Sequence, residues 1–130
     1  MSIKQMHEQS QQAYWQWRNN RTNQNWDAKE KAIKEFLAAA KEIVANLPFP
    51  WTTAYAYNPH EHANSNGRDH IILRQELHIG RLQRNAGDAL CKPRDKFWGL
   101  EEVSNGSPTC VKCLEIAERT ITPKAKQAAA

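Results

Sequence analysis

The first fifty residues carry apolar side chains at the three- and four-residue spacing of α-helices. Residues 3–20 combine an apolar face with a face rich in glutamine. A second stretch has a continuous apolar stripe opposite a charged side: Ala32, Ile33, Phe36, Leu37, Ala40, Ile43, Val44 and Leu47. Pro48 and Pro50 cannot continue it. The pattern predicts a helical pair over residues 1–47, with Asn25 or Asp27 capping the second helix.

Beyond residue 50 the apolar positions alternate, which favours β-strands. The segments WTTAYAY, HIILRQ and ELHIGRL are strand candidates, and RNAGDA is a hairpin turn that returns the chain through Ala-Leu-Cys. The segment LEIAERT predicts a short helix. We therefore expect an α+β fold, in which the helical pair packs on a small antiparallel zinc-stapled β unit. Residues 1–122 form a single domain in this prediction (1–47 helical, 51–122 zinc-binding β part), and 123–130 form a flexible tail.

The composition narrows the compartment in which the chain works. No run approaches the roughly 18 consecutive apolar residues of a membrane helix. The first residues, MSIKQMHEQSQQ, lack the layout of a secretion signal. We expect a cytoplasmic protein with no membrane partner, in which three cysteines serve metal or thiolate chemistry and not a disulfide framework.

The cysteines have the spacing of a zinc site. Cys110 and Cys113 form a Cys-x-x-Cys turn, which supplies two thiolates from one bend, and Cys91 offers a third. His78 lies on the first arm of the predicted hairpin with Cys91 on the second, so we predict His78 as the fourth ligand of a structural zinc. Three other histidines could take that place: His60, His62 and His70. A redox pair and buried cysteines without a ligand are the remaining interpretations.

The order of His78, Cys91, Trp98 and the segment TCVKCLEIA resembles that of small zinc-finger-like proteins of actinobacteria and their phages. The resemblance covers about residues 76–118. It implies ligation by three cysteines and one histidine, and it implies no particular activity.

The segment RDHIILRQELHIGRLQRNAGDALCKPRDK also resembles the core of an HNH nuclease. That resemblance implies that His70 is the general base and that Asn85 holds the turn. The metal-binding position of that motif falls at Asp95, and Arg94 stands where the second cysteine would be. A carboxylate can bind magnesium, so this resemblance keeps a metal-dependent nuclease open as an alternative.

Charge and aromatic residues suggest two kinds of partner. The net charge is +4, and the densest basic run surrounds Cys91, where it would contact nucleic acid: Arg81, Arg84, Lys92, Arg94 and Lys96. Trp15 and Trp17 lie in the segment YWQWRNNRTNQNW and cannot both face the same side of one helix. We expect one of them to be exposed or to contact a partner, a protein or a nucleic acid, and burial in the core is the other interpretation of these aromatic residues.

These patterns contain no convincing pair of nucleophile and base, so we expect no enzyme. They favour a small zinc-stabilised binding protein, an accessory or regulatory factor of phage or mobile-element type that binds a protein complex. Nucleic-acid binding and an HNH-like nuclease are the alternatives, and the sequence pattern fixes no oligomeric state.

Overall fold

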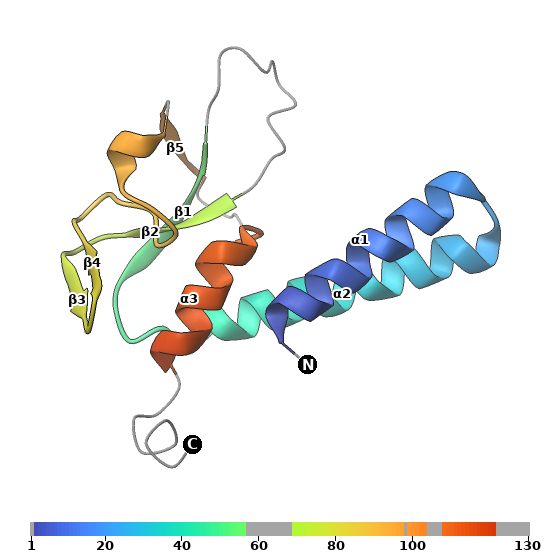
Figure 1. Ribbon diagram of the computed structural model, residues 1–130, viewed down its shortest axis with the longest axis horizontal. Coiled ribbons are helices and arrows are strands. Elements are labelled where there is room, and N and C mark those ends of the chain that lie inside the picture. The colour runs from blue at the N-terminus through green and yellow to red at the C-terminus, as the bar shows by residue number, and fades with distance from the viewer. Residues whose placement is uncertain (1, 57–68, 98, 104–107, 122–130) are drawn as a thin grey trace.

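The computed structural model describes residues 2–56, 69–97, 99–103 and 108–121. Two N-terminal helices are followed by a small antiparallel sheet and a short C-terminal helix (Figure 1). The predicted α+β class is confirmed. His60, His62, Trp98 and the tail 123–130 lie outside the described residues. Within the described part of the chain, no helix is long and apolar enough to cross a membrane.

Helices α1 (Ile3–Asn19) and α2 (Asn23–Ala45) form an antiparallel hairpin. Ser2 caps α1, because its hydroxyl accepts a hydrogen bond from the Gln5 backbone and the Gln5 side chain accepts one from Ser2 N. Thr22 caps α2 through its hydroxyl, so the predicted caps Asn25 and Asp27 are wrong. The Asn25 side chain instead donates to the Asn20 carbonyl at 2.8 Å, inside the turn that joins the helices.

The main sheet has three antiparallel strands in the order β2-β1-β5. Strand β1 (Trp51–Ala56) pairs on one side with β2 (Asp69–Leu73) and on the other with β5 (Leu100–Val103). The alternation in the sequence predicts β1 and β2, whereas it gives no signal for β5. A separate hairpin consists of β3 (Leu77–Ile79) and β4 (Leu82–Arg84).

The predicted turn around Gly87 is present, but the predicted pairing across it, of residues 76–82 with Ala-Leu-Cys, is wrong. The chain already reverses at Gly80, whose φ of 58° suits glycine, so that His78 pairs with Gln83. After β4 it turns again at Gly87 and runs antiparallel to β2, where Leu90 N donates to the Ile71 carbonyl at 2.8 Å. Cys91 therefore returns beside β2, and not beside β3.

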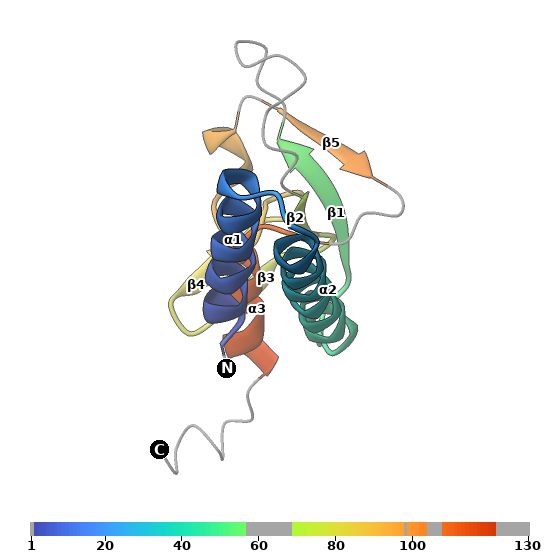
Figure 2. The ribbon, with the colours of Figure 1, turned by 90° about the vertical axis from the view of Figure 1, so that its right-hand side faces the viewer.

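Helix α3 (Val111–Ile121) packs against α1, α2 and β2. One hydrophobic core joins all four elements, and its fully buried side chains include Ile3, Ile71, Leu73, Leu90 and Leu114. The α1–α2 hairpin contacts this core only near the N-terminus of α1 and the C-terminal half of α2. Its far end extends away from the sheet (Figures 1 and 2).

Candidate metal centre

Four side chains that are distant in sequence meet beside β2. His70 comes from β2, Cys91 from the segment that returns along β2, Cys110 from the residue before α3, and Cys113 from the first turn of α3. Their nitrogen and sulfur ligand atoms all lie within 4.8 Å of one another. We call these four residues the metal cluster.

The spacing of the ligand atoms suits a tetrahedral metal. The Nδ1 atom of His70 lies 3.4 Å from Cys91 Sγ and 3.7 Å from Cys113 Sγ. With bonds of about 2.3 Å to sulfur and 2.0 Å to nitrogen, neighbouring ligand atoms of a tetrahedral zinc lie about 3.5 to 3.8 Å apart. The two distances from His70 therefore match a tetrahedral zinc site, and all four ligand atoms lie close enough together to share one metal ion.

Backbone hydrogen bonds hold the Cys-x-x-Cys turn against the start of β2. The Asp69 carbonyl accepts from the backbone N–H groups of Thr109 and Cys110, at 3.0 and 3.1 Å. The Thr109 hydroxyl accepts from Asp69 N at 3.0 Å. Leu114 N donates to the Cys110 carbonyl, which starts α3 immediately after the first cysteine. The geometry of His70 relative to Cys110 is thus fixed by main-chain contacts.

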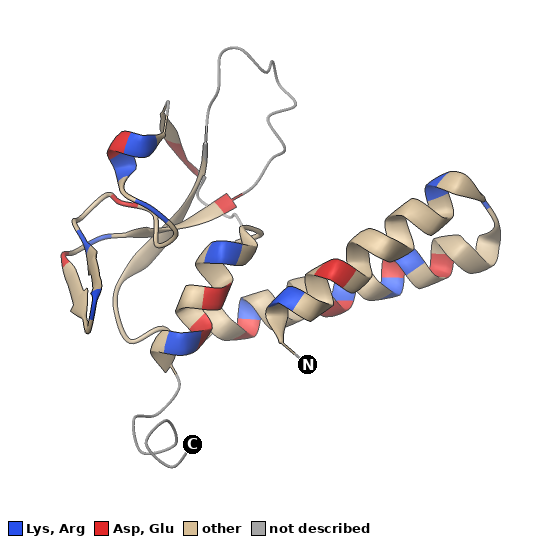
Figure 3. Cartoon of the chain, in the orientation of Figure 1, with Lys and Arg blue, Asp and Glu red and all other residues tan. Residues whose placement is uncertain are grey.

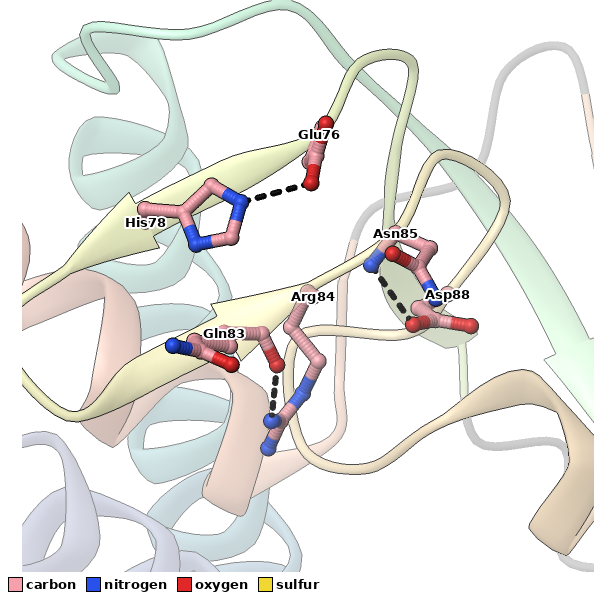
Figure 4. A network of polar contacts seen from close by, with 6 residues as sticks. All are labelled: Glu76, His78, Gln83, Arg84, Asn85 and Asp88. Atoms are coloured by element: carbon pink, nitrogen blue, oxygen red, sulfur yellow. Dashed lines mark hydrogen bonds and ion pairs between the residues drawn. The ribbon is translucent and has the colours of Figure 1, made fainter.

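A buried carboxylate shapes the segment that carries Cys91. Asp88 accepts from the backbone N–H group of Asn85 at 2.8 Å (Figure 4). It also accepts from the backbone N–H group of Arg94 at 2.8 Å. These bonds close the loop on both sides of Cys91. They leave its thiol next to the His70 imidazole.

The surroundings of the cluster are largely apolar. Cys110 and Cys113 are buried, and Cys91 is half-buried. The Phe97 ring packs edge-on against the His70 ring, with centroids 5.0 Å apart. The Lys92 ammonium lies 4.3 Å from the centroid of that phenyl ring. Cys91 is therefore the least buried residue of the metal cluster.

The charges of the donors are strongly coupled. Hydrogen bonds from Cys113 and Cys91 lower the pKa of the Cys110 thiol far below its usual range, whereas burial raises the pKa of Cys113. Burial alone would lower the pKa of His70, but its hydrogen bonds to Cys110 and Cys91 raise that pKa to about 9. The lowered pKa of Cys110 and the raised pKa of His70 mean that the cluster stabilises a thiolate next to a positive charge. A bound divalent cation would supply such a charge.

His78 is not part of the metal cluster, which corrects the predicted fourth ligand. It lies exposed on β3, where its Nε2 atom is 2.6 Å from Glu76 Oε1 (Figure 4). The physical reason is the early reversal at Gly80, which pairs His78 with Gln83 and sends Cys91 to β2. His70 was one of the three alternatives. Its position directly before the apolar run Ile71, Ile72, Leu73, on the same strand, is the sequence signal that favours it, because a histidine buried there needs polar partners.

The residues of the HNH resemblance have other contacts in this structure. The Nδ1 atom of His70 faces sulfur atoms, so it would have to leave the cluster to act as a general base. Asn85 does lie in a turn, through its backbone bond to Asp88. Asp95 is exposed in the short 3-10 helix η2 (Arg94–Lys96). A nuclease reaction stays a prediction.

The five basic residues surround the β3–β4 hairpin and η2, far from the outer end of the α1–α2 hairpin (Figure 3). Two of them already have intramolecular contacts: Arg84 donates to the Gln83 carbonyl, and Lys92 lies over Phe97. Arg81, Arg94 and Lys96 are exposed. Contact with nucleic acid at this surface stays a prediction.

The two tryptophans differ as their spacing predicts. Trp15 is 54% exposed, whereas Trp17 is half-buried between the helices, where its ring meets that of Trp26 at 5.1 Å. Trp26 is itself 44% exposed. Among the tryptophans that the structure describes, Trp15 and Trp26 are therefore the exposed ones, which a partner can reach.

Residues 62–121 match a protein family described as a domain of unknown function, DUF8336. Comparison with curated proteins and with solved structures gives no match. The matched segment is slightly less than half of the chain, contains the whole metal cluster, and leaves out α1, α2 and β1. The chain is thus similar to this family in its metal-cluster part, and the family's description assigns no activity.

Proposed function

We propose that the protein is a small zinc-stabilised binding protein whose α1–α2 hairpin contacts a partner protein. The observation that carries this proposal is the outer end of the hairpin, where large aromatic side chains are exposed far from the metal cluster. Tyr14, Trp15 and Trp26 are 37%, 54% and 44% exposed. The exposure of three aromatic rings in one small region is typical of a protein interface.

The donor set supports zinc as the metal. Three thiolates and one imidazole are a common ligand set of structural zinc sites, and here the four ligand atoms lie within 4.8 Å of one another. Four protein ligands leave no open position for water, so the ion would stabilise the fold without supplying catalysis. His70, Cys91, Cys110 and Cys113 would hold it.

The contacts within the hairpin support its role as a rigid platform. Lys29 Nζ lies 3.6 Å from the Trp26 centroid and 4.8 Å from the Trp17 centroid. The guanidinium carbon of Arg21 lies 4.9 Å from the centroid of the Trp17 ring. Rings held by such cation–π contacts lose little side-chain entropy on binding, which favours affinity. We further propose that the protein is an accessory factor of phage or mobile-element type. This part of the proposal rests on the resemblance of the metal-binding segment to the zinc-finger-like proteins, because the family match assigns no role.

The proposal is tested by capture of partners from a host lysate on the immobilised full chain, with and without nuclease. We expect a protein partner that survives nuclease treatment. Trp26→Ala should weaken its binding by about 30-fold, which corresponds to about 2 kcal/mol, with little dependence on salt. Ile79→Ala, which removes an exposed apolar residue of β3, is the matched control and should bind normally.

Nucleic acid as the partner would give the opposite result. Binding would then depend on Arg81, Arg94 and Lys96, fall steeply with salt, and disappear after nuclease treatment. This outcome, with Trp26→Ala unaffected, would refute the proposed protein-binding role.

A further inference from the structure

The face of α1 that points away from α2 has an unusual composition. Nine exposed residues form this face, six of them with amide side chains, and we call them the amide face: Lys4, Gln5, Glu8, Gln9, Gln11, Gln12, Trp15, Gln16 and Asn19. Glu8, Gln12, Trp15 and Asn19 follow one another at intervals of four, three and four residues. This spacing forms a straight stripe when a second helix packs alongside.

The amide face contrasts with the exposed side of α2. There, charged residues cover the helix: Lys31, Lys34, Glu35, Lys41 and Glu42. Charged side chains keep a helix surface in water, whereas an amide can be buried at low cost if it meets another amide. Each glutamine or asparagine side chain offers both donors and an acceptor. The amide face is therefore complementary to itself.

We propose that the amide face packs lengthwise and antiparallel against the same face of a second copy of this chain. Two shallow hollows along α1 share Glu8 and Gln12, and the first also reaches Trp15. In ridges-into-grooves packing, such hollows between side chains receive the side chains of the facing helix. A two-fold pair uses one surface twice, so every amide gains a partner from an identical face.

The charges favour the antiparallel direction. Glu8 lies in the first half of α1, and Arg18 lies in its last turn at the border of the amide face, where its guanidinium donates to the Tyr14 hydroxyl and lies 5.5 Å from the centroid of the Trp15 ring. Antiparallel packing around the stripe brings Glu8 of one copy near Arg18 of the other, whereas parallel packing sets Glu8 against Glu8. The helix dipoles also oppose one another in the antiparallel arrangement.

The length of α1 limits the area of the interface between the two copies, and therefore the affinity of the dimer. Seventeen residues span about 25 Å, which gives a modest interface with one large anchor, Trp15. We expect a dissociation constant in the micromolar range. This inference rests on the proposed binding role of the hairpin, and it leaves Trp26 of α2 for the other partner.

Sedimentation equilibrium of the purified, zinc-loaded full chain tests the pair without any lysate. We expect a reversible monomer–dimer equilibrium. Gln12 is near the centre of the stripe, so Gln12→Lys brings two ammonium groups within about one helical turn of each other and should weaken dimerisation at least tenfold. Gln12→Glu should do the same, and an equimolar mixture of the two variants should dimerise again. Lys34→Glu on α2 is the control and should dimerise normally.

The direction is tested by charge reversal. Glu8→Arg should weaken the dimer, and Glu8→Arg combined with Arg18→Glu should restore it. In a parallel pair the double reversal would restore nothing, and this result would refute the antiparallel arrangement. A wild-type chain that stays monomeric at high concentration, or a dimer that Gln12→Lys leaves unchanged, would overturn the inference. Partner capture that depends on Trp26 in a monomeric protein would overturn it while leaving the proposed function intact.

Discussion

His70 and His78 differ in environment although both lie on short strands. His70 is buried beside three sulfur atoms and a phenyl ring, whereas His78 is exposed and its Nε2 atom contacts Glu76. A metal ligand needs neighbouring donors at bonding geometry, and only one of these two imidazoles has them. The chemical role of a histidine in this chain therefore depends on its strand position, and not on its distance in sequence from a cysteine.

At the residue scale, we predict that His70→Ala loses the metal and His78→Ala keeps it. Removal of one of four ligands weakens binding strongly, and metal binding contributes directly to the stability of the folded state. Elemental analysis of the purified variants and their melting temperatures measure both effects. His70→Cys should retain the metal, because four thiolates also form a tetrahedral zinc site. Loss of metal from His78→Ala, with normal content in His70→Ala, would contradict the assignment.

At the element scale, the α1–α2 hairpin is held together at its outer end by a cation and two indoles. Lys29 is buried, its ammonium lies over Trp26 and near Trp17, and it pairs with Glu30 at 2.9 Å. These contacts satisfy a charge that would otherwise be costly to bury. The hairpin is thus stabilised far from the shared core, by contacts between its own two helices.

We predict that Lys29→Met destabilises the protein by about 1 kcal/mol, since the thioether keeps the length of the side chain and loses the cation–π attraction. Urea unfolding followed by tryptophan fluorescence measures the change. Lys31→Met, at an exposed position of the same helix, is the control and should change the free energy of unfolding little. Equal stability of the two variants would show that the Lys29 contacts contribute nothing net.

At the scale of the whole molecule, the metal cluster and the hairpin end are separate sources of stability. The cluster ties β2, the segment around Cys91 and the start of α3, whereas the outer hairpin depends on α1–α2 packing. Proteins open locally in cooperative units of unequal stability. Loss of the metal should therefore act first on the part that the cluster joins.

We predict that a strong chelator lowers the melting temperature and speeds amide hydrogen exchange in residues 69–73, 88–92 and 110–121. Exchange in the outer hairpin, about residues 14–30, should change much less. Hydrogen exchange followed by mass spectrometry, with and without the chelator, resolves these segments. Unchanged exchange everywhere would argue against a metal that stabilises the fold, and an equal increase in all segments would show that the chain unfolds as one unit.

The sequence by itself determined the features that follow from local physics. Apolar spacing defined the helical pair, because a helix must bury one side, and Pro48 and Pro50 set its end. The Cys-x-x-Cys spacing marked two donors that one turn must bring together. Residues two positions apart on an α-helix point about 200° away from each other, so the sequence also predicts that Trp15 and Trp17 lie on different sides of α1. Each of these outcomes depends on neighbours within a few residues.

Only the tertiary structure decided which histidine joins the cysteines and which strands pair. The histidine that completes the metal cluster is the one on the strand beside which Cys91 lies. That strand is determined by whether the chain turns at Gly80, at Gly87 or at both. The chain uses both, so Ala-Leu-Cys runs beside β2 and reaches His70. Strand β5 likewise exists because it completes the hydrogen bonds of β1 across almost fifty residues. Such pairings gain their free energy from contacts between distant segments, which local propensity does not encode.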